Sequence, residues 1–356
     1  MPTAFTITPP ADFVLKRDAC SYGYFLLAPN RWVPAELALN RALRLPSGPA
    51  WVRITQPGKR GSDLTIQPDR TLSAADCAAV VVALRRMLRL DETADHIRAF
   101  HRLDPRWRRS GVGRLCRSPS LFEDVIKTVT SCNVAWPSTV AMNRRLCEHF
   151  GQGGCFPEPG DLADLRPATL RARCGVGYRD QRIVDLSRMF ADGAVNVAWL
   201  EDPATPDHAL REHLLQWPGI GPYAANNILQ LLGRYGHLPL DSESVRHGRD
   251  VLGIRGTERA IFKKVHAHFL PFGDQCFRSY WFELREHHQA KAGPAHTWQT
   301  EATATAFTAR NLKALAKAAR PTRAAATASP KPRAVTGTLT GTPRRSSKRT
   351  PQSRRR

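Results

Sequence analysis

The feature that most constrains this chain is a short turn between two predicted helices, Leu214-Leu-Gln-Trp-Pro-Gly-Ile-Gly-Pro-Tyr-Ala-Ala-Asn226. Gly219 and Gly221 permit positive φ angles, so the chain can reverse direction within a few residues. Pro222 suits the first turn of the next helix, where its missing N–H is not needed. Such a turn presents free backbone amides at a helix N-terminus, where an anion can bind. An ordinary helix–helix turn with glycine as C-cap is the alternative interpretation.

The charge of the chain favours a nucleic-acid phosphate as that anion. Among 356 residues, 53 are Lys or Arg and 31 are Asp or Glu, which gives a formal net charge of +22. Such an excess indicates a polyanionic partner, either nucleic acid or an anionic membrane. From Ala290 onward, 15 basic residues stand against one acid, Glu301. Because the end of this segment has no aromatic residues, residues 290–356 are predicted to form a largely disordered basic tail.

Several other classes are disfavoured. The longest apolar run, residues 77–84, is far shorter than the ~20 residues of a membrane helix. The N-terminus lacks the basic and then apolar regions of a secretory signal. The eight cysteines contain no CxxC pair, which argues against a zinc ribbon or an iron–sulfur cluster. We therefore expect reduced thiols, no membrane association and a cytoplasmic location, with the nucleoid as the site if the source is bacterial.

Hydrophobic patterns predict a β-rich N-terminal region followed by helices. Residues 51–55 and 64–67 alternate between apolar and polar side chains, as strands do, and the aromatic run 22–27 is also interpreted as a strand. Helices are expected over 74–90 and from residue 121, each preceded by a capping-box pattern.

The fold class that follows is mostly α, with a small antiparallel β-sheet at the N-terminus. Further helices are expected over 138–150 and within 169–190, where Gly175 and Gly177 break the pattern. We expect a β-rich domain over 1–95 that ends in a helix, a helical region over 96–289, and the basic tail over 290–356.

Asp241 is the residue that favours chemistry. It follows Tyr223 by eighteen positions and opens another predicted helix. A plain N-cap is the commoner use of an aspartate at such a position. A carboxylate at this distance from an anion-binding turn nevertheless suggests a second role.

The segment 217–241 resembles the signature of the helix-hairpin-helix DNA glycosylases, in which a PGIG hairpin and a helix precede a single Asp. Residues 130–133 and 142–151 are similar to the part of the 8-oxoguanine branch that carries a gap-filling Asn, and residues 174–179 to its loop with a wedge Tyr followed by an Arg. Arg278-Ser-Tyr-Trp281 is similar to the alkyl-purine branch. The resemblance covers roughly residues 12–288 and implies two helical subdomains beside the small sheet.

This resemblance implies a DNA glycosylase of base excision repair, which flips out a damaged purine, alkylated or oxidised, and hydrolyses its N-glycosidic bond. Asp241 would stabilise the oxocarbenium-like transition state. Gly219, Gly221 and Tyr223 would bind DNA at the hairpin. The implied partner is double-stranded DNA that contains a damaged base, and the family precedent is a monomer.

The implied contacts inside the duplex come from three residues. Tyr178 would fill the gap left by the flipped base, while Asn133 and Arg179 would hydrogen-bond the partner base. Three further aromatic residues are candidates for stacking on the flipped base, with core packing as the alternative: Trp136, Tyr280 and Trp281.

Departures from the family pattern narrow the activity. Bifunctional members carry a Lys at the position of Tyr223, and no Lys lies between Gly219 and Asp241, so a monofunctional enzyme without lyase activity is expected. No metal or iron–sulfur cofactor is expected, although the hairpin is compatible with a structural monovalent cation. Ser138 stands where the 8-oxoguanine enzyme has its cytosine-reading Arg. The alternatives left open are an 8-oxoguanine or mismatch glycosylase of the same fold, or a non-catalytic binder of damaged DNA.

Overall fold

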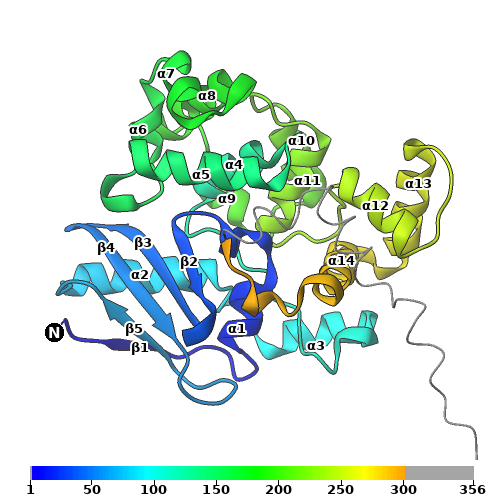
Figure 1. The fold of residues 1–356 in the computed structure, drawn as a ribbon, viewed down its shortest axis with the longest axis horizontal. Helices are drawn as coiled ribbons and strands as arrows, with labels where there is room; N and C mark the ends of the chain where they lie inside the picture. Colours follow the sequence, from blue (N-terminus) through cyan, green and yellow to red (C-terminus); the bar gives the residue numbers. More distant parts are fainter. Residues whose placement is uncertain (1, 301–356) are drawn as a thin grey trace, which may run out of the picture. The chain divides into compact units, whose positions relative to one another are not determined.

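The structure is a computed structural model that describes residues 2–300, which lie within one compact unit. Figure 1 shows an N-terminal sheet followed by helices. The helices are α1 Leu15–Asp18, α2 Ala74–Met87, α3 Ala94–Leu103, α4 Leu121–Ser131, α5 Trp136–Phe150, α6 Pro159–Ala163, α7 Pro167–Cys174, α8 Asp180–Ala191, α9 Val197–Glu201, α10 Asp207–Leu215, α11 Pro222–Leu231, α12 Ser242–Asp250, α13 Glu258–Phe269 and α14 Cys276–Ala292. No helix in this described part is both long and apolar enough to cross a membrane.

The sheet is antiparallel, with the order β1-β5-β4-β3-β2. Its strands are β1 Phe5–Ile7, β2 Asn30–Val33, β3 Ala38–Leu45, β4 Gly48–Thr55 and β5 Leu64–Pro68. Burial alternates along β5 and along β4 from Ala50, because one face of the sheet packs on the core and the other meets solvent. The predicted strands at 51–55 and 64–67 are therefore confirmed.

The aromatic run 22–27 is not a strand. Gly23–Leu26 forms a 3₁₀ turn, in which the Phe25 amide donates to the Tyr22 carbonyl at 3.2 Å. An unbroken apolar run lacks the alternation that would distinguish a strand from a buried helical turn. The prediction from this segment was wrong, and the error matters because the turn lies beside the candidate site.

The predicted caps are largely confirmed. Ser73 and Asp76 form a complete capping box at the start of α2. At α4 only half of the box forms, since Ser120 accepts from the Glu123 amide while the Glu123 side chain is used by other residues. The helix expected from residue 138 begins two residues earlier, at Trp136, with Pro137 in its first turn.

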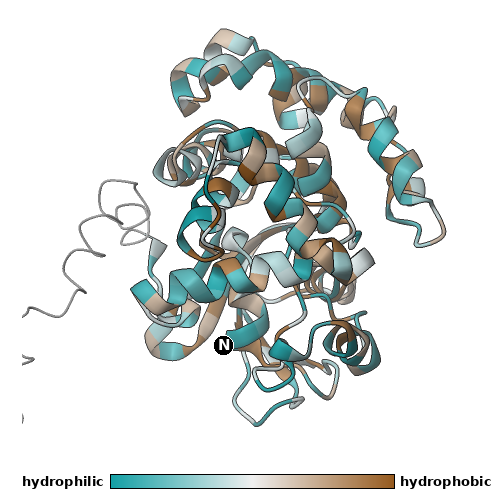
Figure 2. Ribbon diagram, turned by 90° about the vertical axis from the view of Figure 1, so that its right-hand side faces the viewer, coloured by the Kyte–Doolittle hydropathy of each residue, from teal (hydrophilic) through white to brown (hydrophobic). Residues whose placement is uncertain are grey.

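Two hydrophobic cores divide the described chain. One core contains only residues from 121 to 232, and its helices carry both hydrophobic and hydrophilic residues (Figure 2). The other core combines residues 7–116 with residues 231–295, so it needs both ends of the described chain. The expected boundary near residue 95 lies within the first of these two ranges, and it stays a prediction.

The folded part also extends past the expected boundary at residue 289. Helix α14 continues to Ala292, and Ala295 is buried. The Trp32 indole donates to the His296 carbonyl at 2.7 Å, which fixes this segment against β2. The remainder of the predicted tail, residues 301–356, lies outside the described residues.

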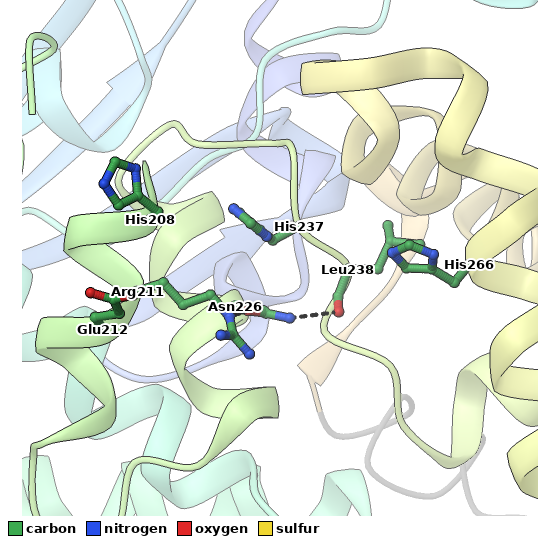
Figure 3. A pocket seen from close by; sticks show the side chains of 7 residues that line it. All are labelled: His208, Arg211, Glu212, Asn226, His237, Leu238 and His266. Atoms are coloured by element: carbon green, nitrogen blue, oxygen red, sulfur yellow. Dashed lines mark hydrogen bonds between the residues drawn. The ribbon is translucent and has the colours of Figure 1, made fainter. Parts of the chain in front are cut away.

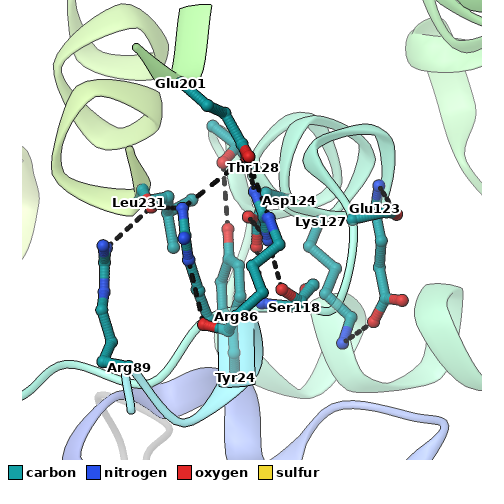
Figure 4. A network of polar contacts seen from close by, with 12 residues as sticks. Tyr24, Arg86, Arg89, Ser118, Glu123, Asp124, Lys127, Thr128, Glu201 and Leu231 are labelled. Carbon is teal, nitrogen blue, oxygen red and sulfur yellow. Dashed lines mark hydrogen bonds and ion pairs between the residues drawn. The ribbon is translucent and has the colours of Figure 1, made fainter. Parts of the chain in front are cut away.

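Two arginines, Arg86 near the end of α2 and Arg89 just after it, connect this helix to the helical region (Figure 4). Arg86 pairs with Asp124 of α4 at 2.8 Å and with Glu201 of α9 at 2.5 Å. Arg89 donates to the Leu231 carbonyl at 2.7 Å, at the end of α11. Because buried charges are costly unless they are paired, these contacts fix how α2 meets the helices that carry the hairpin.

Candidate nucleic-acid interface and active site

The hairpin has the geometry that its sequence predicts. Helix α10 ends at Leu215, Gly219 has a φ of 74°, and Gly221 is the N-cap of α11. No side chain caps this helix, so its first free amides remain open to an outside acceptor. A Cβ at Gly221 would meet no atom within 4 Å, so the N-terminus of α11 is open to an approaching phosphate.

Asp241 is the N-cap of α12, as predicted. Its Oδ1 accepts from the amides of Glu243 at 3.0 Å and Ser244 at 3.1 Å, while the Ser244 hydroxyl accepts from the Asp241 amide at 3.0 Å. These contacts fix the carboxylate through one oxygen only. Burial raises the pKa of this carboxyl above its ordinary value, and the hydrogen bonds from Ser244 and Glu243 oppose the rise without cancelling it. The second oxygen is therefore available in a partly buried site.

Two tyrosines, Tyr223 and Tyr280, lie near the Asp241 carboxylate. Burial raises the pKa of the Tyr223 phenol, and the nearby negative charge of Asp241 raises it further. The same phenol is within hydrogen-bonding reach of Ser131. The Tyr280 hydroxyl is 2.7 Å from the Ser244 hydroxyl. Tyr280 is thus part of the support that orients Asp241, and sequence reasoning missed the Ser244 link because no pattern marks it.

Asn133 and Tyr178, which are predicted to act in the same gap, do meet in the structure. The Asn133 amide donates to the Tyr178 hydroxyl at 3.3 Å, and both residues are exposed. Asn133 has a φ of 52°, a left-handed conformation that places it at the tip of the turn after α4. Tyr178 keeps 49% of its surface exposed, so its ring is accessible from solvent.

Arg179 points into the protein. Only 4% of its surface is exposed, and its guanidinium donates to the carbonyls of Val176, at 3.2 Å, and Cys132. These bonds join the turn before α8 to the turn that carries Asn133. The predicted contact between Arg179 and a partner base would require these hydrogen bonds to break.

The three aromatic pocket candidates differ in their surroundings. Trp281 is partly buried, its indole donates to the Ser21 carbonyl at 2.7 Å, and its ring lies 4.7 Å from that of Tyr22. Trp136 is partly buried and rests against Gly23. Tyr280 is 2% exposed, and its ring packs on Phe269 and His247. Trp217, directly before the hairpin, is 4% exposed and packs in the helical core.

A buried polar network lies beneath α11 and was not predicted. The Tyr22 hydroxyl donates to Asn227 at 2.7 Å, and the Asn227 amide donates to Thr128 at 2.9 Å. Tyr24 lies 2.9 Å from the same Thr128 hydroxyl. Since Tyr22 and Asn227 are 205 positions apart, no local pattern could have paired them.

A polar pocket of about 370 Å³ lies between the hairpin helices α10 and α11, the loop at residues 237–238 and His266 of α13 (Figure 3). There Arg211 of α10 donates to Asn226 of α11 at 3.0 Å, and Asn226 donates to the Leu238 carbonyl at 2.9 Å. These bonds brace the hairpin against the loop that leads to Asp241. The remaining lining residues are His208, Glu212, His237 and His266. In residues 2–300, no group of three or more His, Cys, Asp or Glu side chains is arranged to hold a metal ion.

Comparisons with known proteins place this geometry in a known fold. The 3-methyladenine DNA glycosylase of Archaeoglobus fulgidus matches with a TM-score of 0.61 at 16% identity, over 80% of this chain and 98% of that one. The 8-oxoguanine glycosylase/lyase of Clostridium acetobutylicum matches with a TM-score of 0.56 at 17% identity, over 80% of this chain and 97% of that one. MBOgg1, which was solved with a low-affinity DNA ligand, matches with a TM-score of 0.60 at 20% identity, over 81% of this chain and 97% of that one. At these identities the likeness shows the fold, which is that of these glycosylases.

A sequence comparison agrees with the structural ones. A curated protein of Bacillus subtilis (strain 168), named "Putative DNA-3-methyladenine glycosylase YfjP", is 26% identical over 126 residues, which is 34% of this chain. The matched part spans 43% of the relative, less than half its length. No family model matches the chain.

Proposed function

We propose that this chain, which has the fold of the 8-oxoguanine and 3-methyladenine DNA glycosylases, is a monofunctional DNA glycosylase of base excision repair. The observation that carries the proposal is the position of Asp241, fixed by backbone amides through one oxygen while the other is available beside the hairpin. The structural neighbours support DNA as the partner, since some of them were solved with DNA bound. The substrate class is a damaged purine, alkylated or oxidised.

The chemistry assigned to Asp241 follows from its charge. Cleavage of the N-glycosidic bond builds positive charge on the deoxyribose, and a fixed carboxylate stabilises that charge. The same carboxylate can orient or deprotonate the attacking water, so the base leaves and an abasic site remains. Tyr223 would contact the DNA beside the reacting sugar, with the hairpin glycines binding a backbone phosphate.

The Asn133–Tyr178 pair is assigned to the gap that base flipping leaves. An exposed phenol at a loop tip can stack where the extruded base was, which offsets the few kcal/mol that unstacking costs. Its hydrogen bond with Asn133 holds the two side chains together before DNA arrives. Trp136 and Trp281, both partly buried near residues 21–23, are the better candidates for the wall of the base pocket. Electron-rich rings would favour a cationic, alkylated purine.

The test is a panel of duplexes that each carry one lesion: 1,N6-ethenoadenine, hypoxanthine, 8-oxoguanine or uracil, together with methylated bulk DNA. Each is incubated with the full chain and analysed with and without alkali. Strand cleavage that requires alkali and is confined to one lesion would support a monofunctional glycosylase and identify its substrate. Tight binding to damaged duplexes with no base release would instead favour a non-catalytic damage binder.

Borohydride should trap no covalent protein–DNA complex. The position that carries the Lys nucleophile in bifunctional relatives holds Tyr223, whose phenol cannot form an imine. The buried lysine in α4, Lys127, is 0% exposed and pairs with Glu123 at 2.7 Å, so it cannot reach a sugar. The measurement is gel analysis after reduction, beside a bifunctional 8-oxoguanine glycosylase/lyase as positive control. A trapped complex would show that another amine acts as a lyase.

The excision rate should fall in acid with a midpoint above 3.8, the ordinary pKa of an aspartate. Burial raises the pKa of Asp241 in the folded protein, and only the ionised form stabilises the sugar cation. The rate is therefore full above the raised pKa and declines as pH drops through it. Single-turnover rates measured from pH 4 to 8 with enzyme in excess give this profile. A flat profile across that range would contradict a raised pKa.

Deletion of residues 301–356 should weaken DNA binding at raised salt and leave the chemistry intact. The deleted segment holds 14 Lys and Arg residues and one Glu, which supply salt-sensitive, sequence-independent attraction to DNA. A cut at residue 300 spares the ordered contacts of Ala295 and His296. Binding is measured as a function of salt, and single-turnover excision at saturation. A large drop in that rate would assign the tail a role beyond attraction.

A further inference from the structure

Arg182, on the first turn of α8, touches both DNA-facing loops of the candidate site. Its guanidinium carbon lies 4.9 Å from the centroid of the Tyr178 ring. The stem of the same side chain covers Gly219 so closely that a Cβ added at Gly219 would collide with it. One arginine therefore bridges the exposed tyrosine and the phosphate-binding hairpin.

The charge of Arg182 is available, whereas that of its neighbour is not. Within residues 2–300, Arg182 has no hydrogen-bond or ion-pair acceptor, and it is exposed. Arg179 also lies over the Tyr178 ring, at 4.4 Å, but it is buried and donates to two backbone carbonyls. Arg182 thus leaves its N–H groups free at the surface where DNA would lie.

The local electrostatics agree with this placement. Burial raises the pKa of the Cys132 thiol to about 11, and the positive charges of Arg179 and Arg182 oppose that rise. The field of Arg182 therefore reaches the turn that carries Asn133. A free cation between an exposed aromatic wedge and a set of helix N-terminal amides is suited to a phosphate.

We infer that Arg182 is the positioning and DNA-contacting arginine of this site: its guanidinium binds a backbone phosphate between the hairpin and the wedge, and its planar face holds Tyr178 ready for insertion. A phosphate is favoured over a base edge because the stem of Arg182 lies on the hairpin, where phosphate is expected. Arg179 then serves to hold the Asn133 turn. This inference rests on the proposed function, because it assumes that damaged DNA occupies the site.

The test uses the full chain and a duplex with a tetrahydrofuran abasic analogue, which cannot be hydrolysed and therefore measures recognition apart from catalysis. The analogue is placed opposite each of the four bases, and an undamaged duplex serves as reference. The variants are Arg182→Ala and Arg182→Lys, with Arg98→Ala of α3 as the charge-matched control, whose side chain is 61% exposed. Dissociation constants are measured from about 50 to 200 mM salt, and thermal unfolding confirms that each variant folds.

Arg182→Ala should weaken binding about 10-fold and lower the slope of log Kd against log salt by about 1, because one charged phosphate contact is lost. The loss should be equal for all four opposing bases, and the preference for the damaged duplex should shrink. Arg182→Lys keeps the charge, so the dependence of log Kd on log salt should match that of the unmodified chain. It should not restore the preference for the damaged duplex, because an ammonium group has no planar face to stack on Tyr178. Arg98→Ala should change neither quantity.

Each result that differs from these expectations would exclude one part of the role inferred for Arg182. An unchanged salt slope in Arg182→Ala would exclude the phosphate contact, and a loss that depends on the opposing base would reassign the guanidinium to a base edge. Full preference for the damaged duplex in Arg182→Ala would exclude the support of Tyr178. If the unmodified chain does not prefer the abasic duplex, the proposed function itself fails and the inference fails with it.

Discussion

Asp241→Asn should abolish base excision while leaving the fold and DNA binding intact. Asparagine has the same size, is an equally good N-cap, and keeps an oxygen that can accept from the Glu243 and Ser244 amides. What it lacks is the negative charge that stabilises the sugar cation. Loss of one preorganised electrostatic group typically costs about 10²–10³ in rate, so the single-turnover rate should fall at least that far.

The control for this variant is Asp250→Asn at the exposed end of the same helix, α12. It makes the same chemical change away from the hairpin and should retain the full rate. Binding to the abasic-analogue duplex should be similar for both variants and the unmodified chain. If Asp241→Asn kept its rate within 10-fold, Asp241 would be a helix cap only, and the catalytic assignment would be lost.

Glu123→Gln should be the most destabilising conservative change in the sheet–helix contact. Glu123 of α4 accepts two hydrogen bonds from Arg41 of β3, at 2.9 and 2.6 Å, and pairs with Lys127 at 2.7 Å. All three side chains are buried. A neutral glutamine leaves two buried cations without a counter-charge, and breaking a buried pair in this way costs about 3–5 kcal/mol. The free energy of unfolding in denaturant measures the loss.

The pH dependence supplies a second readout of the same cluster. The charges of Arg41 and Lys127 outweigh burial and lower the pKa of Glu123 to about 2, from an ordinary 4.5. A depressed folded-state pKa stabilises the protein above pH 4.5, and that contribution disappears as pH falls towards 2. Glu123→Gln should lack this component of acid unfolding. Glu148→Gln, which removes an exposed partner 3.6 Å from Arg144, should cost under about 1 kcal/mol; equal losses for the two variants would contradict the argument.

Local sequence determined the parts of the site that depend on a few adjacent residues. The hairpin and the N-cap at Asp241 were predictable because glycine placement and capping act over two to four positions. The meeting of Asn133 and Tyr178 followed only from the family resemblance, since 45 residues separate them. The proposed wall of the base pocket could not be predicted from local patterns, because Trp136 of α5 and Trp281 of α14 meet residues 21–23, which are far away in the sequence.

One error shows where local reasoning ends. The 22–27 run was assigned as a strand because hydrophobicity alone fits both a strand and a buried turn. In the structure the Tyr22 and Tyr24 hydroxyls contact residues more than 100 positions away, which no local pattern could indicate. The Arg179 guanidinium also donates to a distant acceptor, the Cys132 carbonyl, and its contact with a partner base stays a prediction. Such tertiary hydrogen bonds leave no periodic pattern in the sequence.

The division of the apolar interior into two cores has a consequence for how the chain matures on the ribosome. Residues 121–232 can complete their core as soon as they have emerged, because every member of that core lies within this stretch. Residues 7–116 must wait until residues 231–295 have been synthesised. During that interval the sheet presents apolar surface that a chaperone would have to cover. Asp241 is made within the same interval, after the hairpin, and the support of its helix by Tyr280 has to wait for α14.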